Sequence, residues 1–189
     1  MATTEKASTR DRLLDAATEL FYRDGVSIGV EALCRTAGVS KRSMYQLFAS
    51  KDEVLAASLD RRLPAYAARL LPGPEDATTP RERILYTFEQ LERISTEPGY
   101  EGCPFLAAQV ELKDPDHQAS VVARAAKEKL QEALRTEAEA GGAREPAVLA
   151  RQLMLVFDGA SARSGVHVED LDGLTTATVA ILLDAAGVR

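Results

Sequence analysis

The stretch that decides the fold is VEALCRTAGVSKRSMYQLF, residues 30–48. Gly38 divides it into two short segments, and glycine adopts the left-handed backbone of a tight turn without steric cost. Cys34, four residues earlier, provides the small side chain that is needed where two helices cross. Met44 and Leu47 are expected to anchor the second helix. This spacing predicts a helix-turn-helix.

A third helix is required, because two helices of about eight residues are too short to be stable alone. Residues 10–23 provide it, with apolar side chains at helical spacing. Ser8 and Asp11 have the spacing of a capping box at its start, and Gly25 is placed to end it. Ser27 is expected to cap the helix that follows.

The rest of the chain is predicted to be helical almost throughout, because Ala, Leu, Glu and Arg dominate and strand-like alternation is absent. The later helices are expected to begin near Ser50, Pro80, Pro104, Asp114-Pro115, Pro146 and Leu174. We therefore predict an all-α fold of about nine helices. A three-helix helix-turn-helix domain is expected over residues 1–50, and a larger helical domain over residues 51–189.

Composition and charge limit the classes of function. The 189 residues are 46% hydrophobic and carry a net charge of −6, which is ordinary for a soluble globular protein. No apolar run approaches the roughly 18 residues of a membrane span, and the polar N-terminus lacks a signal region. We therefore expect a cytoplasmic protein. Cys34 and Cys103 form no C-x-x-C pair and are expected to be reduced thiols.

No arrangement of residues typical of an enzyme is present. The chain has no Gly-x-Ser-x-Gly elbow, phosphate-binding loop or dinucleotide-binding glycine run. Its two histidines, His117 and His167, leave little material for a metal site. The acidic group between Glu111 and His117 is expected to be exposed, with Asp114 as a helix cap. We predict no catalytic residues, no metal and no cofactor.

Residues 10–55 resemble the DNA-binding domain of TetR-family regulators. The resemblance is carried by Phe21, Gly25, Ala37-Gly38-Val39-Ser40, Tyr45, Phe48 and Ser50-Lys51. The chain departs from the family's usual pattern in Arg42-Ser43-Met44, Gln46 and Leu47, on or beside the expected reading face. The resemblance therefore implies the fold and a DNA-binding role, but it does not carry over an operator sequence.

The resemblance also implies roles for particular side chains. Four are candidates for contacts to DNA phosphates, which position a protein without reading sequence: Ser27, Ser40, Tyr45 and Lys51. Arg and Lys can pair with guanine, and Gln with adenine, so the candidates for reading bases are Lys41, Arg42, Ser43 and Gln46. The alternative for each is plain solvent exposure, and Tyr45 could instead pack in the small core.

The larger domain is expected to bind a small-molecule effector, because TetR-like proteins hold effectors among these helices. A pocket there should be mostly apolar with a few polar groups. The candidates to line it are Tyr86, Phe105, Gln109, Met154 and Phe157. Each could instead belong to the ordinary core.

The last two predicted helices are expected to form a homodimer interface. Leu174, Ile181 and Leu182 give the final helix a wide apolar face, and the small residues around Gly159 permit close approach of another helix. A dimer would place two reading helices about 34–36 Å apart, in successive major grooves. The alternative is that both helices only complete the core of their own chain.

These features predict a DNA-binding transcriptional regulator, by the family's default a repressor that releases a palindromic operator when a small molecule binds. The alternative is a helix-turn-helix protein without a small-molecule effector, gated by a protein partner or ungated. A cavity of several hundred Å³ among the helices of the larger domain would favour the sensor, and a filled core the alternative.

Overall fold

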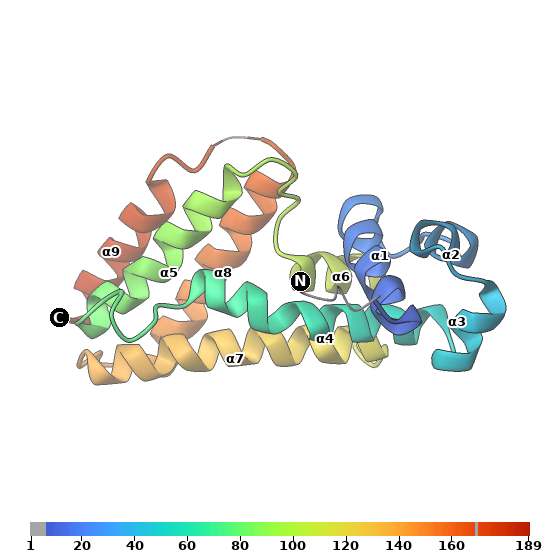
Figure 1. Cartoon of the computed structure of the whole chain (residues 1–189). Coiled ribbons are helices and arrows are strands. Elements are labelled where there is room, and N and C mark those ends of the chain that lie inside the picture. The colour runs from blue at the N-terminus through green and yellow to red at the C-terminus, as the bar shows by residue number, and fades with distance from the viewer. Residues whose placement is uncertain (1–6, 169) are drawn as a thin grey trace, which may run out of the picture. The chain divides into compact units, whose positions relative to one another are not determined.

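The computed structural model describes residues 7–168 and 170–189, and within these ranges it contains nine α-helices and no strand (Figure 1). The helices are α1 Thr9–Asp24, α2 Val30–Ala37, α3 Lys41–Leu47, α4 Lys51–Leu70, α5 Pro80–Ser95, α6 Pro104–Leu112, α7 Gln118–Ala140, α8 Pro146–Gly165 and α9 Leu174–Ala186. The predicted all-α fold is confirmed. No helix in the described ranges is long and apolar enough to cross a membrane. The expectation of a cytoplasmic protein rests partly on residues 1–6, which lie outside the described residues.

Local sequence signals set several helix ends as predicted. The Ser8 Oγ accepts a hydrogen bond from the Asp11 backbone N–H at 3.1 Å at the start of α1, and Gly25 ends that helix with φ +83°. Thr79 and Glu82 form a complete capping box at the start of α5, where Pro80 is the first helical residue. These ends depend only on neighbouring residues, so the sequence was sufficient to predict them.

The predicted start of the longest helix at Asp114 is wrong. The Asp114 carboxylate accepts a hydrogen bond from the Asp116 N–H at 2.9 Å, and α7 begins only at Gln118. The His117 Nδ1 accepts a hydrogen bond from the Ala119 N–H at 3.1 Å. An aspartate that bonds to the backbone two residues later forms a turn that competes with helix. Asp114 therefore closes a turn and does not cap α7.

The described residues form two compact units. The first comprises the residues up to Arg62 together with Ala107–Arg124, and the second comprises Leu63–Leu106 and Ala125–Arg189. A segment from the middle of the chain is therefore compact with the N-terminal helices. The functional boundary expected at residue 50 stays a prediction.

Helices α1, α2 and α3 pack against one another to form the core of the first unit. Leu13 of α1, Leu33 of α2 and Met44 of α3 are fully buried. Burial of one such side chain contributes about 1.5–3 kcal/mol relative to its exposed state. This packing stabilises α2 and α3, which have only eight and seven residues.

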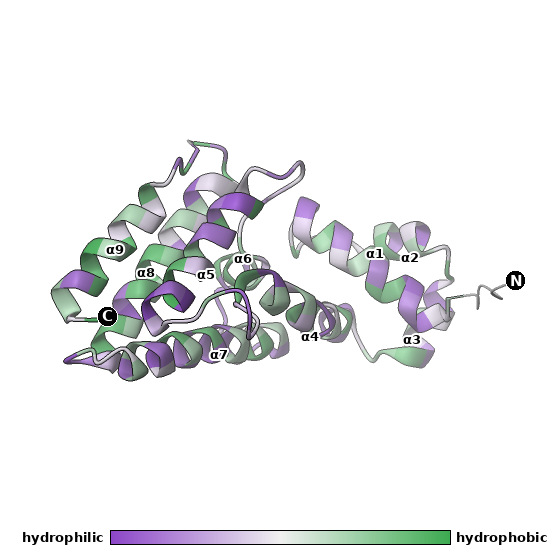
Figure 2. Ribbon diagram, turned by 60° about the vertical axis from the view of Figure 1, so that its left-hand side comes forward, coloured by the Kyte–Doolittle hydropathy of each residue, from purple (hydrophilic) through white to green (hydrophobic). Residues whose placement is uncertain are grey.

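Helices α5, α8 and α9 lie side by side in the second unit (Figure 1). The rings of Phe88 in α5 and Phe157 in α8 meet edge to face, with 6.3 Å between their centroids. Gly102 and Gly165 allow two backbone segments to touch, because a Cβ on Gly165 would lie 2.6 Å from the Gly102 nitrogen. Figure 2 shows apolar residues along much of α9.

Helix α4 contains an internal proline, Pro64. Proline has no backbone N–H, so the helix loses one internal hydrogen bond at this point. The chain passes from the first unit to the second at Leu63. The weakened turn of α4 therefore coincides with the boundary between the units.

Candidate nucleic-acid interface and ligand cavity

The turn between α2 and α3 has the geometry that the sequence predicts. Gly38 is left-handed, with φ +63° and ψ +38°, and its N–H donates to the Arg35 carbonyl at 3.2 Å. The guanidinium of Arg12 in α1 donates a hydrogen bond to the Gly38 carbonyl oxygen at 3.1 Å. Arg12 thus supports the turn from 26 positions away. The sequence analysis missed this contact, because no local pattern signals it.

Met44 anchors α3 as predicted, but Leu47 does not. Met44 is fully buried, and its sulfur lies 3.9 Å from the Cys34 sulfur where α2 and α3 meet. Leu47 is 43% exposed, whereas Phe48 is only 4% exposed. Phe48 lies four positions after Met44 and therefore shares its face at the end of this short helix.

The opposite face of α3 is open to solvent. Lys41, Arg42, Tyr45 and Gln46 are exposed, and Ser43 is half-buried. Tyr45 keeps 54% of its surface exposed, so it does not pack in the core. This face presents cationic, amide and phenol groups together, which are the groups that contact bases and phosphates. Their DNA contacts stay predictions.

Ser40 caps α3 from the position that the sequence indicates. Its Oγ accepts a hydrogen bond from the Ser43 N–H at 3.0 Å and lies 2.8 Å from the Ser43 Oγ. Capping satisfies one backbone donor that a helix start otherwise leaves unpaired. The predicted phosphate contact of Ser40 is not tested by this geometry.

An ion pair on the exposed face reduces the effective charge of Lys41. Its Nζ lies 2.6 Å from the Glu31 Oε1 of α2. The hydrogen bond between them raises the pKa of Lys41 and lowers the pKa of Glu31. Both side chains are exposed, so the pair contributes little to stability. Its main effect is to place a negative charge beside a residue that is expected to contact DNA.

Lys51 has a structural role in addition to its predicted phosphate contact. Its Nζ donates to the carbonyl oxygens of Val26 at 2.7 Å and Ile28 at 3.1 Å. An ammonium group has three N–H donors, so a third is left for a phosphate oxygen.

The predicted cap at Ser27 is wrong, because α2 is preceded by Gly29 and has no side-chain cap. Ser27 is exposed, and its phosphate contact stays a prediction.

The segment Ala107–Arg124 contacts the N-terminal helices within the first unit. The Glu111 Oε2 accepts a hydrogen bond from the Val26 N–H at 2.8 Å, and the His117 Nε2 lies 3.6 Å from the Asp52 Oδ2. The sequence analysis treated these residues as solvated surface. Glu111 is indeed exposed, yet it makes a specific contact beside the helix-turn-helix.

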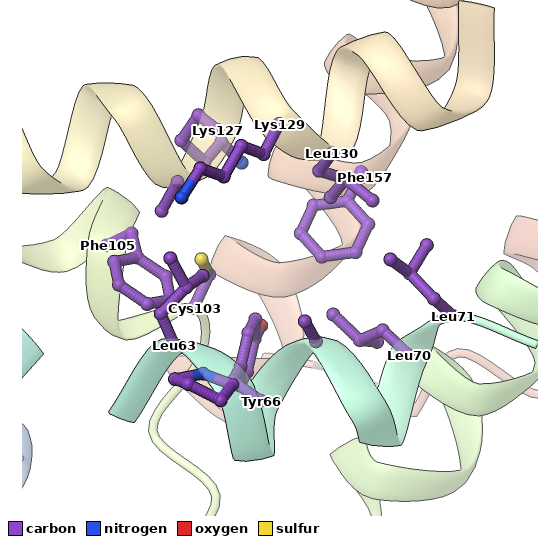
Figure 3. Close-up of a pocket in the computed structure, with 13 residues that line it drawn as sticks. Leu63, Tyr66, Leu70, Leu71, Cys103, Phe105, Lys127, Lys129, Leu130 and Phe157 are labelled. Carbon is purple, nitrogen blue, oxygen red and sulfur yellow. The ribbon is translucent and has the colours of Figure 1, made fainter. Parts of the chain in front are cut away.

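The second unit contains a cavity of about 330 Å³ (Figure 3). Phe105 and Phe157, two of the five predicted lining residues, border it. Tyr86 and Gln109 do not, and Gln109 belongs to the first unit. Met154 borders a separate recess instead. Helical spacing indicated correctly that Phe105, Met154 and Phe157 are buried, but it could not tell which buried side chains surround the same space.

Two lysines of α7 lie at the cavity wall (Figure 3). The Lys127 amine pairs with the Asp158 carboxylate and lies 4.7 Å from the centroid of the Phe157 ring. Lys129 is exposed and also borders the cavity. Both residues were missed by the sequence analysis, because two lysines on a polar helix are typical of a solvated face.

Comparison with known proteins identifies the family. The sequence profile described as "Bacterial regulatory proteins, tetR family" matches residues 13–58. A solved structure from Streptomyces avermitilis, assigned as a TetR transcriptional regulator, is 58% identical to this chain. The match covers 97% of this chain and 100% of that chain, with a TM-score of 0.94. This chain belongs to the TetR family.

Other transcriptional regulators are similar to this family member over different lengths. A solved TetR-family transcriptional regulator from Streptomyces coelicolor is 26% identical, covers 95% of this chain and 96% of its own, and has a TM-score of 0.81. An uncharacterized HTH-type transcriptional regulator from Mycobacterium tuberculosis is 34% identical over 85 residues, which are 44% of this chain and 42% of that protein. The match therefore spans less than half the length of this curated relative.

Proposed function

We propose that this TetR-family protein is a repressor that binds a palindromic DNA operator as a homodimer and releases it when a small molecule occupies the cavity of the second unit. The observation that carries the proposal is the division of α3 into two faces. Met44 is fully buried, whereas Arg42, Tyr45 and Gln46 are exposed. In a helix-turn-helix, the exposed face of the second helix lies in the major groove.

A homodimer is supported by apolar side chains that a single chain leaves exposed. Leu155 of α8 is 75% exposed, and Leu174 and Ile181 of α9 are 61% and 68% exposed. The surface at Gly159 is open, since a Cβ there would meet no atom within 4 Å. A second copy related by a twofold axis would cover these residues in a four-helix interface.

The cavity supports a sensor over a regulator that has no small-molecule effector. Its volume of about 330 Å³ lies at the lower end of the range for small-molecule pockets. Its lining is largely apolar with a few polar groups, which is the usual composition of such pockets. A filled core would have favoured the alternative.

Helix α6 supports a route from the cavity to the reading helix. Phe105 near its start borders the cavity, and Glu111 near its end accepts the hydrogen bond from Val26. In this proposal a ligand that contacts Phe105 acts through the continuous chain of α6 on the bond at Val26, in the connection between α1 and α2. Coupling between such sites is typically about 1–3 kcal/mol.

The first experiment selects DNA fragments from the source genome on the purified protein at about 150 mM salt, which suppresses non-specific binding. An inverted repeat is expected to be enriched, and Arg42→Ala is expected to lose it. The matched control is Arg93→Ala, which removes an exposed arginine of α5 whose guanidinium donates hydrogen bonds to the Gln90 Oε1. This control is expected to retain the enrichment.

Two results would contradict the proposal. If no repeat is enriched, or if Arg42→Ala enriches it as well as the wild type does, α3 is not the reading helix. If DNA affinity is unchanged when the cavity is saturated with a bound molecule, the release step is wrong even though DNA is bound.

A further inference from the structure

We infer that the effector of this cavity is an apolar molecule with one carboxylate group, which the Lys129 amine binds at the cavity wall. The inference rests on the proposed function, in which the cavity is the effector site, and it adds the chemical class of the effector. It follows from three properties of the cavity: its apolar lining, the unpaired positive charge of Lys129 at its wall and its volume.

Most of the cavity wall is apolar. Leu63 and Leu70 come from α4, Phe105 from α6, Leu130 from α7 and Phe157 from α8. Figure 3 shows these side chains around a common space. Burial of apolar surface against these side chains favours binding of an apolar molecule. The greater part of the ligand is therefore hydrocarbon, either aliphatic or aromatic.

The charge at the cavity wall is positive. Lys127 and Lys129 are the charged residues that line it, and no aspartate or glutamate does. Lys127 is already neutralised by Asp158. Among the described residues, Lys129 has no carboxylate partner within 4.0 Å. One positive charge is thus left without a counterion beside an apolar space.

One surplus positive charge selects a ligand with one negative charge. A cationic head would be repelled by the unpaired Lys129 charge, and a neutral head would gain only a hydrogen bond from it, which is weaker than one to an anion. A doubly charged phosphate would keep one of its charges without a cationic partner at this wall, because Lys127 is already paired with Asp158. A carboxylate is the monoanion that forms short charge-assisted hydrogen bonds with an ammonium group.

The volume sets the size of the ligand. A cavity of about 330 Å³ corresponds to about eleven liquid water molecules, at roughly 30 Å³ each. Molecules with on the order of ten to fifteen non-hydrogen atoms therefore fit, such as a medium-chain fatty acid or a two-ring aromatic acid.

The test compares each acid with its neutral amide. The probes are decanoate against decanamide, and 1-naphthylacetate against 1-naphthaleneacetamide. Their binding to the full-length protein is measured by calorimetry at low salt, without DNA. At least one carboxylate is expected to bind about fivefold or more tightly than its amide. This preference should shrink as salt is added, because salt screens an exposed charge.

Substitutions at Lys129 test whether this residue causes the preference for carboxylate over amide. Lys129→Gln is expected to weaken carboxylate binding about fivefold and to leave amide binding unchanged, which also reports an intact cavity. Lys129→Glu should reverse the preference. The matched control is Lys113→Gln, which removes the same charge from the first unit. Ala67→Leu fills part of the cavity wall and should weaken acid and amide alike.

Each other outcome overturns the inference. It is wrong if no carboxylate binds more tightly than its amide, if no probe binds at millimolar concentration, or if Lys129→Gln leaves the preference intact. These results would not touch DNA selection by α3. Conversely, the protein could bind carboxylates more tightly than amides and yet enrich no operator. That result would contradict the proposed function but not the carboxylate preference of the cavity.

Discussion

The Glu111 carboxylate accepts a hydrogen bond from the Val26 backbone N–H at 2.8 Å, although 85 positions separate the two residues. Val26 follows Gly25, which ends α1 with φ +83° and ψ 174°. A Cβ on Gly25 would lie 2.6 Å from the Glu111 Oε2. The connection that leads from α1 to the helix-turn-helix is therefore shaped around a side chain from α6.

Gly25→Ala is expected to lower the free energy of unfolding by about 1–3 kcal/mol, because its backbone conformation is essentially restricted to glycine. The measurement is urea denaturation. The cost should be smaller in a Glu111→Ala background, where the close contact is gone, but it should not vanish. Gly29→Ala is the control, since Gly29 has φ −77° and open space at its Cβ. Equal effects of the two glycine substitutions would contradict this account.

Glu31→Gln is expected to tighten DNA binding, because it releases Lys41 from the ion pair at 2.6 Å. If Lys41 then neutralises one more phosphate, the slope of log affinity against log salt steepens by about 0.9. Fluorescence anisotropy on the selected operator at several salt concentrations measures both quantities. Glu19→Gln removes the same charge from an ion pair with Arg23 in α1 and serves as the control. A slope that stays at the wild-type value would show that Lys41 gains no phosphate contact when the ion pair with Glu31 is removed.

Glu82→Gln is expected to remove a pH-dependent part of the stability. Hydrogen bonds from the Thr79 backbone and from Thr78 lower the pKa of Glu82 from 4.5 to about 2. A group whose pKa is lower in the folded state stabilises the protein above its unfolded pKa. The contribution is therefore present above pH 4.5 and is lost as the pH falls from 4.5 towards 2. The melting temperatures of the two proteins should converge over that window, and a constant difference would speak against the capping role.

Leu155→Glu and Ile181→Glu are each expected to convert the proposed dimer into a monomer, because a charge would be buried at the centre of an apolar interface. Light scattering after size-exclusion chromatography measures the mass. Val110→Glu places the same charge at an exposed apolar residue of the first unit and should leave the dimer intact. If all three variants behave alike, α8 and α9 do not form the interface.

Local signals account for the parts of the structure that were predicted well. Gly38 adopts the left-handed turn and Ser40 caps α3 through interactions within a few residues, and the helical spacing of Met44 places it on the buried face of α3. The errors arose where two local interactions compete. Asp114 closes a turn in place of a helix cap, and Leu47 lies at a helix end where Phe48 takes the buried position.

By itself, the sequence determined the helical fold, the helix-turn-helix and the exposed character of Arg42 and Gln46, because helical periodicity and capping depend on near neighbours. The tertiary structure alone decided that Glu111 contacts Val26 and that Lys129 borders a cavity with Phe105. Periodicity tells which face of a helix is buried, but not which other helix covers it. That partner is set by how all the helices pack together, over distances along the chain that no local pattern spans.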